Sequence, residues 1–210
     1  MNHVIESLQW RYATKKFNSA AKLSDEHLDT LKEAIRLSAS SYGMQPYEVF
    51  IIQDPEIRKQ LREVSWGQSQ ITDASCLIVF ASKTDVTASD TEAYMKNISK
   101  TRNIPVENLS GYANMINNAV VQLPTDIKGN WTAKQAYIAL GNLLATAAQL
   151  RIDACPMEGF DADGYDRILG LKAQGLHTAV IAAVGYRAPE DDMQHLPKVR
   201  KTAEELFHTI

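Results

Sequence analysis

The sequence predicts an α+β domain in which helices surround a small buried sheet, and four segments indicate this fold class. Residues 77–81 and 178–184 are continuous apolar runs without alternation, as expected of strands that are covered on both faces. Residues 47–52 form a short run rich in β-branched and aromatic side chains, which favours a third strand. Residues 131–150 carry apolar side chains around most of the circumference of a helix, which is typical of a helix inside the core.

The N-terminal half begins with an apparent short helix that ends before Arg11. Ser24 is a good N-cap because two acidic residues follow it, and apolar residues then recur at helical spacing to about Ser38. Tyr42-Gly43 interrupts this pattern before the strand at 47–52, and Asp54-Pro55 begins the next helix. The order helix, strand, helix therefore precedes the first buried strand at 77–81.

Residues 84–130 differ from the rest of the chain. They are polar, rich in Asn, Thr and Asp, and contain Pro105 and Pro124, with only weak helical periodicity. We interpret the segment as a helical excursion or lid inserted between two core elements. The chain has neither an internal repeat nor a Gly/Ser linker, so residues 1–210 are expected to form a single domain.

Size, charge and cysteine content describe an ordinary globular protein. The 210 residues carry 22 basic and 25 acidic side chains, a net charge of −3, which argues against nucleic acid or an anionic membrane surface as partner. No run reaches the roughly 18 apolar residues of a membrane span, and the N-terminus lacks a signal pattern. Cys76 and Cys155 both lie in apolar runs and are expected to be free and buried, so we expect a cytoplasmic protein.

Several common kinds of site are missing. The five histidines are scattered without metal-binding spacing, so no metal site is expected. Neither a nucleophile elbow nor an activated cysteine is evident, and Gly170 to Gly175 resembles a P-loop only at its ends. A Rossmann glycine fingerprint is also missing, so a nicotinamide would have to be held in another way.

Short polar segments at the ends of predicted elements remain as candidates. The turn from Arg11 to Lys15 combines a guanidinium, which suits phosphate, with an ammonium, which can lie beside a single oxygen or ring nitrogen. Ser38–Pro46, Pro156–Phe160 and Leu196–Lys201 are further candidates. Taken singly, each also fits a solvated charge run, a helix end or a plain loop.

Together these segments resemble the nitroreductase family of flavin mononucleotide (FMN) oxidoreductases. The resemblance covers nearly the whole chain, and although no single motif is specific, six occur in the family's order. They are Arg11-Tyr-Ala-Thr-Lys15, Ser40-Ser41 to Gln45-Pro46, Asp73-Ala-Ser75, Trp131-Thr-Ala-Lys-Gln135, Pro156-Met-Glu-Gly-Phe-Asp161 and Leu196-Pro-Lys-Val-Arg200. The fold that this resemblance implies is a central mixed or antiparallel sheet surrounded by helices, in an intertwined homodimer with two flavins at the interface.

The resemblance also implies which residues hold FMN. Arg11, Lys198 and Arg200 would bind the phosphate and ribityl chain, and Lys15 would lie near N1 and O2, where reduction leaves negative charge. The implied cofactor-binding residues are Arg11, Tyr12, Ala13, Lys15, Ser40, Ser41, Gln45, Gln70, Pro156, Met157, Glu158, Gly159, Lys198 and Arg200. The flavin would carry the chemistry, while Lys15 and Glu158 tune it.

Individual placements follow from the same resemblance. Pro156 and Met157 would line one face of the ring, and the backbone N–H groups of Glu158 and Gly159 would point at N5 and O4. Ser40, Ser41 and Gln45 would approach the flavin from the partner subunit. The dimer would thus be part of the site.

Two departures from the family pattern affect the ring end of the site. Close relatives have an Asn and a Lys upstream of the Asp-Ala-Ser segment, and the aligned residues here are Gly67 and Gln70. Since Gln70 brings no charge, we expect less stabilisation of the reduced flavin, hence a lower potential or a different acceptor. Ala13 also replaces a common Ser, which removes a hydroxyl but keeps the backbone donor.

The implied function is transfer of hydride from NADH or NADPH through flavin N5 to a nitroaromatic, quinone or similar flat acceptor, in a ping-pong cycle. A free-flavin reductase, a flavin oxidase or a dehydrogenase on the same scaffold is an alternative enzyme. A non-catalytic FMN-binding regulatory protein is an alternative of another class. The sequence does not distinguish NADH from NADPH, because it contains no legible site for a 2′-phosphate.

Overall fold

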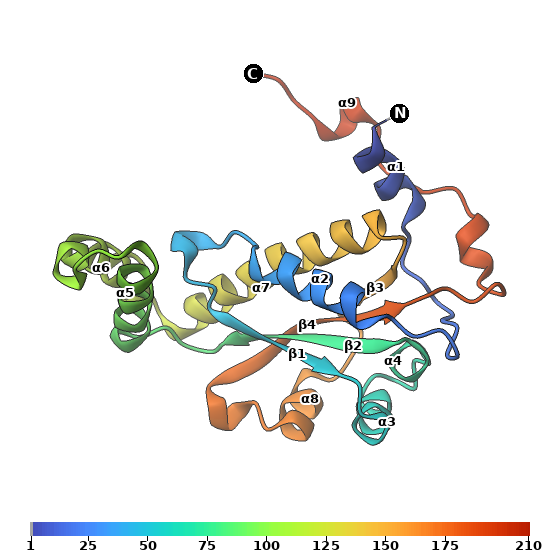
Figure 1. Cartoon of the computed structure of the whole chain (residues 1–210), viewed down its shortest axis with the longest axis horizontal. Helices are drawn as coiled ribbons and strands as arrows, with labels where there is room; N and C mark the ends of the chain where they lie inside the picture. The colour runs from blue at the N-terminus through green and yellow to red at the C-terminus, as the bar shows by residue number, and fades with distance from the viewer. Residues whose placement is uncertain (1) are drawn as a thin grey trace.

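The computed structural model describes residues 2–210, which form a four-stranded antiparallel sheet between two layers of helices (Figure 1). The spatial order of the strands is β1-β2-β4-β3, and each neighbouring pair is antiparallel. The strands are β1 (Tyr47–Ile52), β2 (Cys76–Lys83), β3 (Asp153–Met157) and β4 (Leu176–Gly185). The predicted α+β class is confirmed, and of the two sheet types expected the antiparallel one is found.

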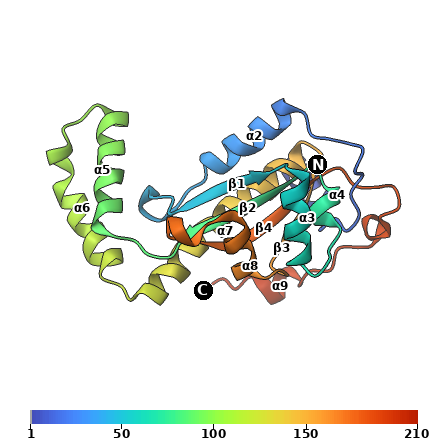
Figure 2. The same ribbon diagram turned by 90° about the horizontal axis from the view of Figure 1, so that it is seen from below.

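Helices cover both faces of this sheet. Helices α2 and α7 pack on one face, and α3, α4 and α8 on the other (Figures 1 and 2). The helices are α1 (His3–Trp10), α2 (Asp25–Arg36), α3 (Pro55–Glu63), α4 (Gln70–Asp73), α5 (Ala88–Arg102), α6 (Ser110–Ile116), α7 (Thr125–Gln149), α8 (Ala162–Leu169) and α9 (Ala203–Leu206). Helix α1 packs near the C-terminal end of α7, so two helices that are far apart in sequence lie side by side.

The two faces of the sheet each have an apolar core. In β2, Ile78 and Phe80 pack against α2 and α7, whereas Leu77 and Val79 pack against α3, α4 and α8. All four side chains are fully buried. This double burial explains why β2 and β4 are apolar without alternation, and it confirms the prediction of a central buried sheet.

The predicted helix starts are confirmed by their caps. The Ser24 hydroxyl accepts a hydrogen bond from the His27 N–H at 3.2 Å at the start of α2. Asp54 accepts from two N–H groups of the first turn of α3, each at 2.9 Å, and Pro55 occupies the first turn. These caps satisfy donors that have no partner inside the helix.

Helix α7 departs from the prediction in two ways. It begins at Thr125, six residues before the expected Trp131, and its extra turn buries Lys128, which pairs with Asp85 at 2.5 Å. It is also not buried all round, because Tyr137 and Ile138 are 39% and 45% exposed. Within one chain, the exposed side of this helix therefore includes large apolar side chains.

Residues 84–130 project from the body as an arm built from α5, α6 and the turns between them (Figures 1 and 2). The arm has a small apolar core of its own, which contains Met95, Ile98, Leu109, Ile116 and Val120. The segment is helical, as expected. Among residues 2–210, no helix has the length and apolar character needed to cross a lipid bilayer.

Candidate functional site

The turn after α1 is fixed by one buried carboxylate from near the end of the chain. Asp191, which is 1% exposed, accepts hydrogen bonds through Oδ2 from the Tyr12 hydroxyl at 2.9 Å and from the N–H groups of Lys15 at 2.7 Å and Lys16 at 3.1 Å. Burial alone would raise the pKa of Asp191, but the hydrogen bonds from Lys16, Lys15 and Tyr12 lower this pKa below its ordinary value. The carboxylate is therefore ionised at neutral pH and holds the turn in place.

A second buried carboxylate ties the same turn to β3. Ala13 bridges Ala154 as a short parallel pair, and the Thr14 hydroxyl donates to Asp153 at 3.2 Å. Asp153 also accepts hydrogen bonds from the Arg187 backbone N–H at 2.8 Å and from the Arg187 Nε at 2.9 Å, and it forms an ion pair with Arg187 Nη2 at 2.7 Å. The turn consequently lies against the strand that leads into Pro156 and Met157.

Three cations meet at the outer end of this turn. The Lys198 ammonium donates to the Arg11 carbonyl, and its pKa is lowered by burial and by the charges of Arg11 and Arg200. Burial and the charge of Arg200 also lower the pKa of Arg11. Within the described chain, no carboxylate lies at salt-bridge distance from any of the three. Mutually repelling cations without an acidic partner are the donor set of an anion site.

The Cys155 thiol lies within the electrostatic reach of the same turn. Burial raises its pKa, and the charges of Lys15 and Arg11 partly oppose this rise. The thiol is buried and uncharged at neutral pH, which is unsuited to a nucleophile. The charges of both cations of the turn therefore reach the middle of β3.

The end of β3 continues into a tight turn at Glu158. Met157 is buried and Pro156 is half-buried, whereas the Glu158 carboxylate is exposed and accepts a hydrogen bond from the Tyr137 hydroxyl of α7 at 2.6 Å. Burial and the bond to Glu158 raise the pKa of Tyr137 to about 12, so this hydroxyl remains a donor at neutral pH. Helix α7 thus fixes the carboxylate side of the turn.

The residues before α4 pack over the same turn. A Cβ atom at Gly159 would lie 2.7 Å from the Trp66 ring, so only glycine allows this contact, and Gln68 donates to the Gly159 carbonyl at 2.7 Å. Within one chain, an indole ring thus approaches the Gly159 backbone closely. Trp66 is 73% exposed and has a left-handed φ of 54°, which is uncommon outside glycine.

Gly67 and Gln70 lie next to this tryptophan. Gly67 has a left-handed φ of 72°, and its carbonyl accepts from the Arg62 guanidinium at 2.9 Å. Gln70 is buried as the first residue of α4. The glycine is thus required by the backbone, and the loop is held by a cation from α3.

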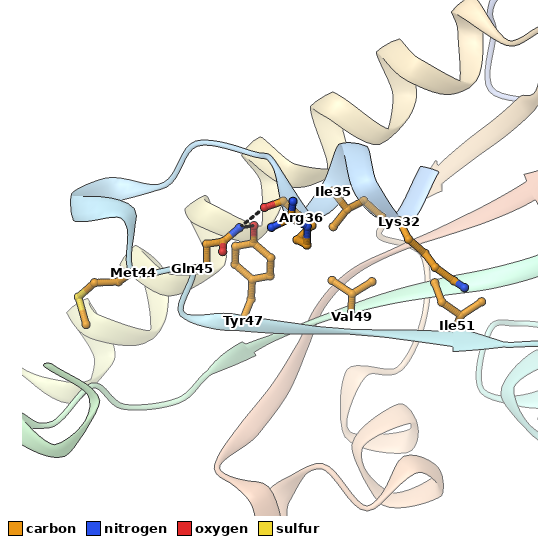
Figure 3. Close-up of a pocket in the computed structure, with 8 residues that line it drawn as sticks. All are labelled: Lys32, Ile35, Arg36, Met44, Gln45, Tyr47, Val49 and Ile51. Carbon is orange, nitrogen blue, oxygen red and sulfur yellow. Dashed lines mark hydrogen bonds between the residues drawn. The ribbon is translucent and has the colours of Figure 1, made fainter. Parts of the chain in front are cut away.

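Ser40, Ser41 and Gln45 do not join the other predicted residues within one chain. The Ser41 N–H donates to Gln135 of α7 at 2.8 Å, and the Gln45 N–H donates to the Ser40 hydroxyl at 2.9 Å. The Gln45 side chain donates to the Arg36 carbonyl at 2.9 Å (Figure 3). This loop lies along α7 toward the arm, whereas α1 and the turn after it lie at the other end of the helix (Figure 1).

The single chain therefore brings together two parts of the predicted site. One comprises Arg11, Tyr12, Ala13, Lys15, Lys198 and Arg200, and the other comprises Pro156, Met157, Glu158 and Gly159. Gln70 is buried in α4, two residues after the Gln68 that contacts Gly159. The sequence interpretation missed Asp153, Asp191, Tyr137 and Trp66. Asp153 had a usable signal, because a charged residue inside an apolar run needs a buried partner. Asp191 stands in an acidic run that looks like a solvated surface.

Comparison with known proteins identifies the family of this chain. The model of a family described as "Nitroreductase family" matches residues 8–186. The chain belongs to the nitroreductase family. A Bacillus subtilis (strain 168) relative named as a candidate NAD(P)H nitroreductase, YfkO, is 34% identical over 218 residues, covering 99% of this chain and 97% of the relative. The "Major NAD(P)H-flavin oxidoreductase" of Aliivibrio fischeri is 34% identical over 217 residues, covering 99% of both chains.

Solved structures agree with this assignment. A protein from Exiguobacterium sibiricum crystallised in complex with FMN has a TM-score of 0.86 at 16% identity, covering 100% of this chain and 98% of that one. A nitroreductase-like protein of Streptococcus mutans has a TM-score of 0.85 at 19% identity, with 98% and 97% covered. The nitroreductase-family fold is therefore established over the whole chain, and by homology the protein is an oxidoreductase of the NAD(P)H nitroreductase type. Of the described residues, no three or more His, Cys, Asp or Glu are grouped to hold a metal.

Proposed function

We propose that this nitroreductase-family protein is an FMN-dependent enzyme that passes hydride from NADH or NADPH to a nitroaromatic, quinone or similar flat acceptor. The carrying observation is the cluster of Arg11, Lys198 and Arg200, which has no acidic partner in the described chain and is joined by one turn to the strand that ends at Met157. Such a cluster suits a phosphate at one end of a ligand whose flat ring lies along the end of the strand. Two free, buried cysteines suit a cytoplasmic location, where nicotinamide donors are plentiful.

The donor set of this chain fits FMN. Arg11, Lys198 and Arg200 would hold the phosphate and ribityl chain, and the turn that Asp191 fixes would carry Lys15 to the pyrimidine end of the ring. Ala13 bridges Ala154 of β3, so the turn is tied to this strand although the hydroxyl common at this position is missing. Tyr12 would help to hold the turn in place, because its hydroxyl donates a hydrogen bond to Asp191.

Bound FMN supplies hydride transfer at N5. The protein's part is placement and charge. Lys15, whose side chain is exposed, would stabilise the negative charge that reduction leaves near N1 and O2. Pro156 and Met157 would cover one face of the ring, and the N–H groups of Glu158 and Gly159 would donate to its edge. Gln70 is neutral, so Lys15 would be the main cation at this end.

A second copy of the chain would complete the site. Ser40, Ser41 and Gln45 lie apart from the cation cluster in one chain, as the resemblance to intertwined homodimers requires. Apolar side chains are exposed on three elements that a partner could cover. They are Val4, Ile5 and Leu8 on α1, Ile127, Tyr137 and Ile138 on α7, and Leu206, Phe207 and Ile210 at the C-terminus.

The C-terminal tail suggests how two copies would hold each other. It extends away from the body of its own chain (Figure 1), and β1 forms an edge of the sheet with unpaired backbone groups. Beside β1 lies a groove of about 650 Å³ with apolar walls that include Ile35, Val49 and Ile51 (Figure 3). We assign the tail of the second copy as the occupant of this groove.

Anaerobic titration of the purified yellow protein tests the enzymatic proposal. NADH or NADPH should bleach the flavin absorbance, and a nitroaromatic or quinone added afterwards should restore it. In steady-state assays, double-reciprocal plots of rate against nicotinamide concentration at several acceptor concentrations should give parallel lines. Protein that purifies without flavin and does not bind added FMN would contradict every flavin-based function. Flavin that neither nicotinamide reduces would indicate a regulatory FMN-binding protein, and reduction by another organic donor would indicate an oxidase or dehydrogenase.

A free-flavin reductase is the second candidate, because the Aliivibrio fischeri relative is named as an NAD(P)H-flavin oxidoreductase. The two candidates differ in the acceptor. Added free FMN or riboflavin should be turned over at least about tenfold faster, in kcat/KM, than any nitroaromatic or quinone if this candidate is right. The reverse order supports the nitroreductase proposal.

A further inference from the structure

The loop between α2 and β1 has an unusual backbone. Tyr42, Gly43 and Gln45 have left-handed φ values of 58°, 79° and 45°, and two of these residues carry full side chains. Such residues persist in this region only where the surroundings hold them there. The same loop contains the three residues that the proposed function assigns to the neighbouring subunit's FMN: Ser40, Ser41 and Gln45. Its conformation therefore decides where those groups point.

Two tyrosines of the arm hold this loop. The Tyr42 carbonyl accepts hydrogen bonds from the Tyr94 hydroxyl of α5 at 2.7 Å and from the Tyr112 hydroxyl of α6 at 2.9 Å. The Tyr112 ring lies 6.5 Å from each of the other two rings, and all three pack against the apolar core of the arm. We call these residues, Tyr42, Tyr94 and Tyr112, the tyrosine clasp.

The clasp leaves no room for change at the next residue. A Cβ atom at Gly43 would lie 2.4 Å from the Tyr94 hydroxyl oxygen. Burial raises the pKa of Tyr94, with a further contribution from Tyr112, so the Tyr94 hydroxyl stays protonated and able to donate at neutral pH. The arm thus fixes the carbonyl of one left-handed residue and occupies the space beside the next.

The other hydrogen bonds of the loop hold the candidate site residues on either side of Tyr42. Ser41 is held through its N–H by Gln135, and Gln45 is held at both its N–H and its side chain by Ser40 and Arg36. These contacts lie immediately before and after Tyr42 in the chain. A rotation at Tyr42 would have to displace at least one of them.

From this geometry we infer that Tyr94 and Tyr112 are positioning residues for the Ser40–Gln45 loop, through which the arm of one subunit controls FMN retention in the other. The inference rests on the proposed function, since it needs an FMN site that two subunits share. It assigns residues 84–130 a role in cofactor binding in addition to any covering of the active site. If Tyr94 and Tyr112 served only to attach the arm to the body, their loss would change thermal stability but not FMN binding.

The test compares Tyr94→Phe/Tyr112→Phe with wild-type protein at 25 °C, using FMN titration of the apo-dimer followed by flavin fluorescence. Loss of both hydroxyls should raise the FMN Kd at least about tenfold. Hydrogen exchange of residues 40–46 should accelerate in the same variant. Tyr186→Phe is the matched control, because its hydroxyl contacts His27 at 3.1 Å, apart from the loop, and it should change neither quantity.

A mixed dimer tests the passage from one subunit to the other. It combines one Tyr94→Phe/Tyr112→Phe subunit with one Arg200→Ala subunit. If each loop serves the partner's flavin, both defects fall on one site and the mixed dimer keeps one tight FMN. If each loop serves its own subunit, both sites are damaged and no tight FMN remains, which would overturn the inference.

Other outcomes are equally clear. An unchanged Kd or unchanged exchange of residues 40–46 in the double variant refutes the inference, whatever happens to the Tm. If the double variant does not fold, the two single variants provide the same comparison. Failure of the proposed function has a different signature: wild-type protein would not bind FMN, or Arg200→Ala and Lys198→Ala would bind it as tightly as wild type.

Discussion

At the scale of single residues, the proposed site gives the two cations of the N-terminal turn different tasks. Arg11 belongs to the cluster with Lys198, whereas Lys15 is held by the hydrogen bond from its backbone N–H to Asp191. Each cation can therefore be removed with a separate expected effect.

Arg200→Ala should chiefly weaken FMN retention. Loss of one charged phosphate contact is expected to raise the FMN Kd by about 10- to 100-fold, with little change in the potential of the flavin that remains bound. Equilibrium dialysis against FMN measures the first quantity, and a redox-dye titration measures the second. Arg102, exposed at the end of α5, provides the control: Arg102→Ala should bind FMN as wild type does.

Lys15→Ala should have the opposite profile. FMN should remain bound within a few-fold of the wild-type Kd, but the two-electron potential should fall by about 30 mV for each ~1.4 kcal/mol of stabilisation lost from the reduced ring. The same dye titration measures this shift. Equal effects of Lys15→Ala and Arg200→Ala on both quantities would contradict the proposed division.

Asp191→Asn should lower stability in a pH-dependent way. The folded pKa of Asp191 lies below the unfolded value of roughly 3.9, so its contribution is fully present above that value and is lost as the pH falls through the folded pKa. The variant should therefore be about 1–2 kcal/mol less stable at pH 7, and this gap should shrink below about pH 4. Urea unfolding between pH 3 and 7 measures it, and a gap that widens toward low pH would exclude the ionised carboxylate as the cause.

At the scale of elements, the loop between α4 and β2 depends on one buried cation. Arg58 of α3 is 4% exposed and donates to three backbone carbonyls, those of Ile71 at 2.7 Å, Ala74 at 2.6 Å and Ser75 at 3.3 Å. Burial lowers the pKa of Arg58 from its ordinary value. The guanidinium thus satisfies the backbone where the chain enters the central strand.

Arg58→Met should be strongly destabilising, because it fills the space but leaves these carbonyls without donors. The expected loss is about 3–5 kcal/mol, measured as a lower urea midpoint with an unchanged slope. Arg167→Met, at an exposed position of α8, is the matched control and should change stability by less than about 0.5 kcal/mol. A midpoint for Arg58→Met near that of the control would show that water replaces the guanidinium.

The strands could be predicted more fully than the helices. Continuous apolar runs mark β2 and β4 because the sheet is buried on both sides, and Asp54-Pro55 marks α3 because local caps decide where a helix starts. The start of α7 was predicted too late. Its first turn contains the buried Lys128, whose partner Asp85 lies 43 residues earlier in sequence and so leaves no local signal.

The site shows the same limit. The sequence offers the motif residues of the turn and of β3 as candidates, but it does not identify Asp191 and Asp153 as the carboxylates that hold them. Asp191 lies 176 residues from Lys15 along the chain, and nothing local distinguishes it from the acidic residues beside it. Trp66 was missed because its importance arises from contact with Gly159, which only folding creates.

At the scale of the whole molecule, the exposed apolar residues of α1, α7 and the C-terminus are the surface that a second subunit would cover. Ile138→Arg on α7 should shift the protein from dimer toward monomer, since a charge cannot be buried there without a partner. Sedimentation velocity should show at least about a tenfold rise in the dimer Kd, together with loss of FMN. Ala173→Arg, on an exposed turn after α8, should leave the dimer intact. Monomeric wild-type protein that binds FMN tightly would contradict the shared site.

The pinning of the N-terminal turn by Asp191 also bears on the order in which the protein is made. Residues 11–16 are synthesised long before residues 191–200, which supply Asp191 and the two cations that join Arg11. Contacts of such sequence separation form late in folding. If FMN binds at this cluster as proposed, its phosphate site cannot form before residues 191–200 have been synthesised, so the binding of FMN would follow the synthesis of those residues.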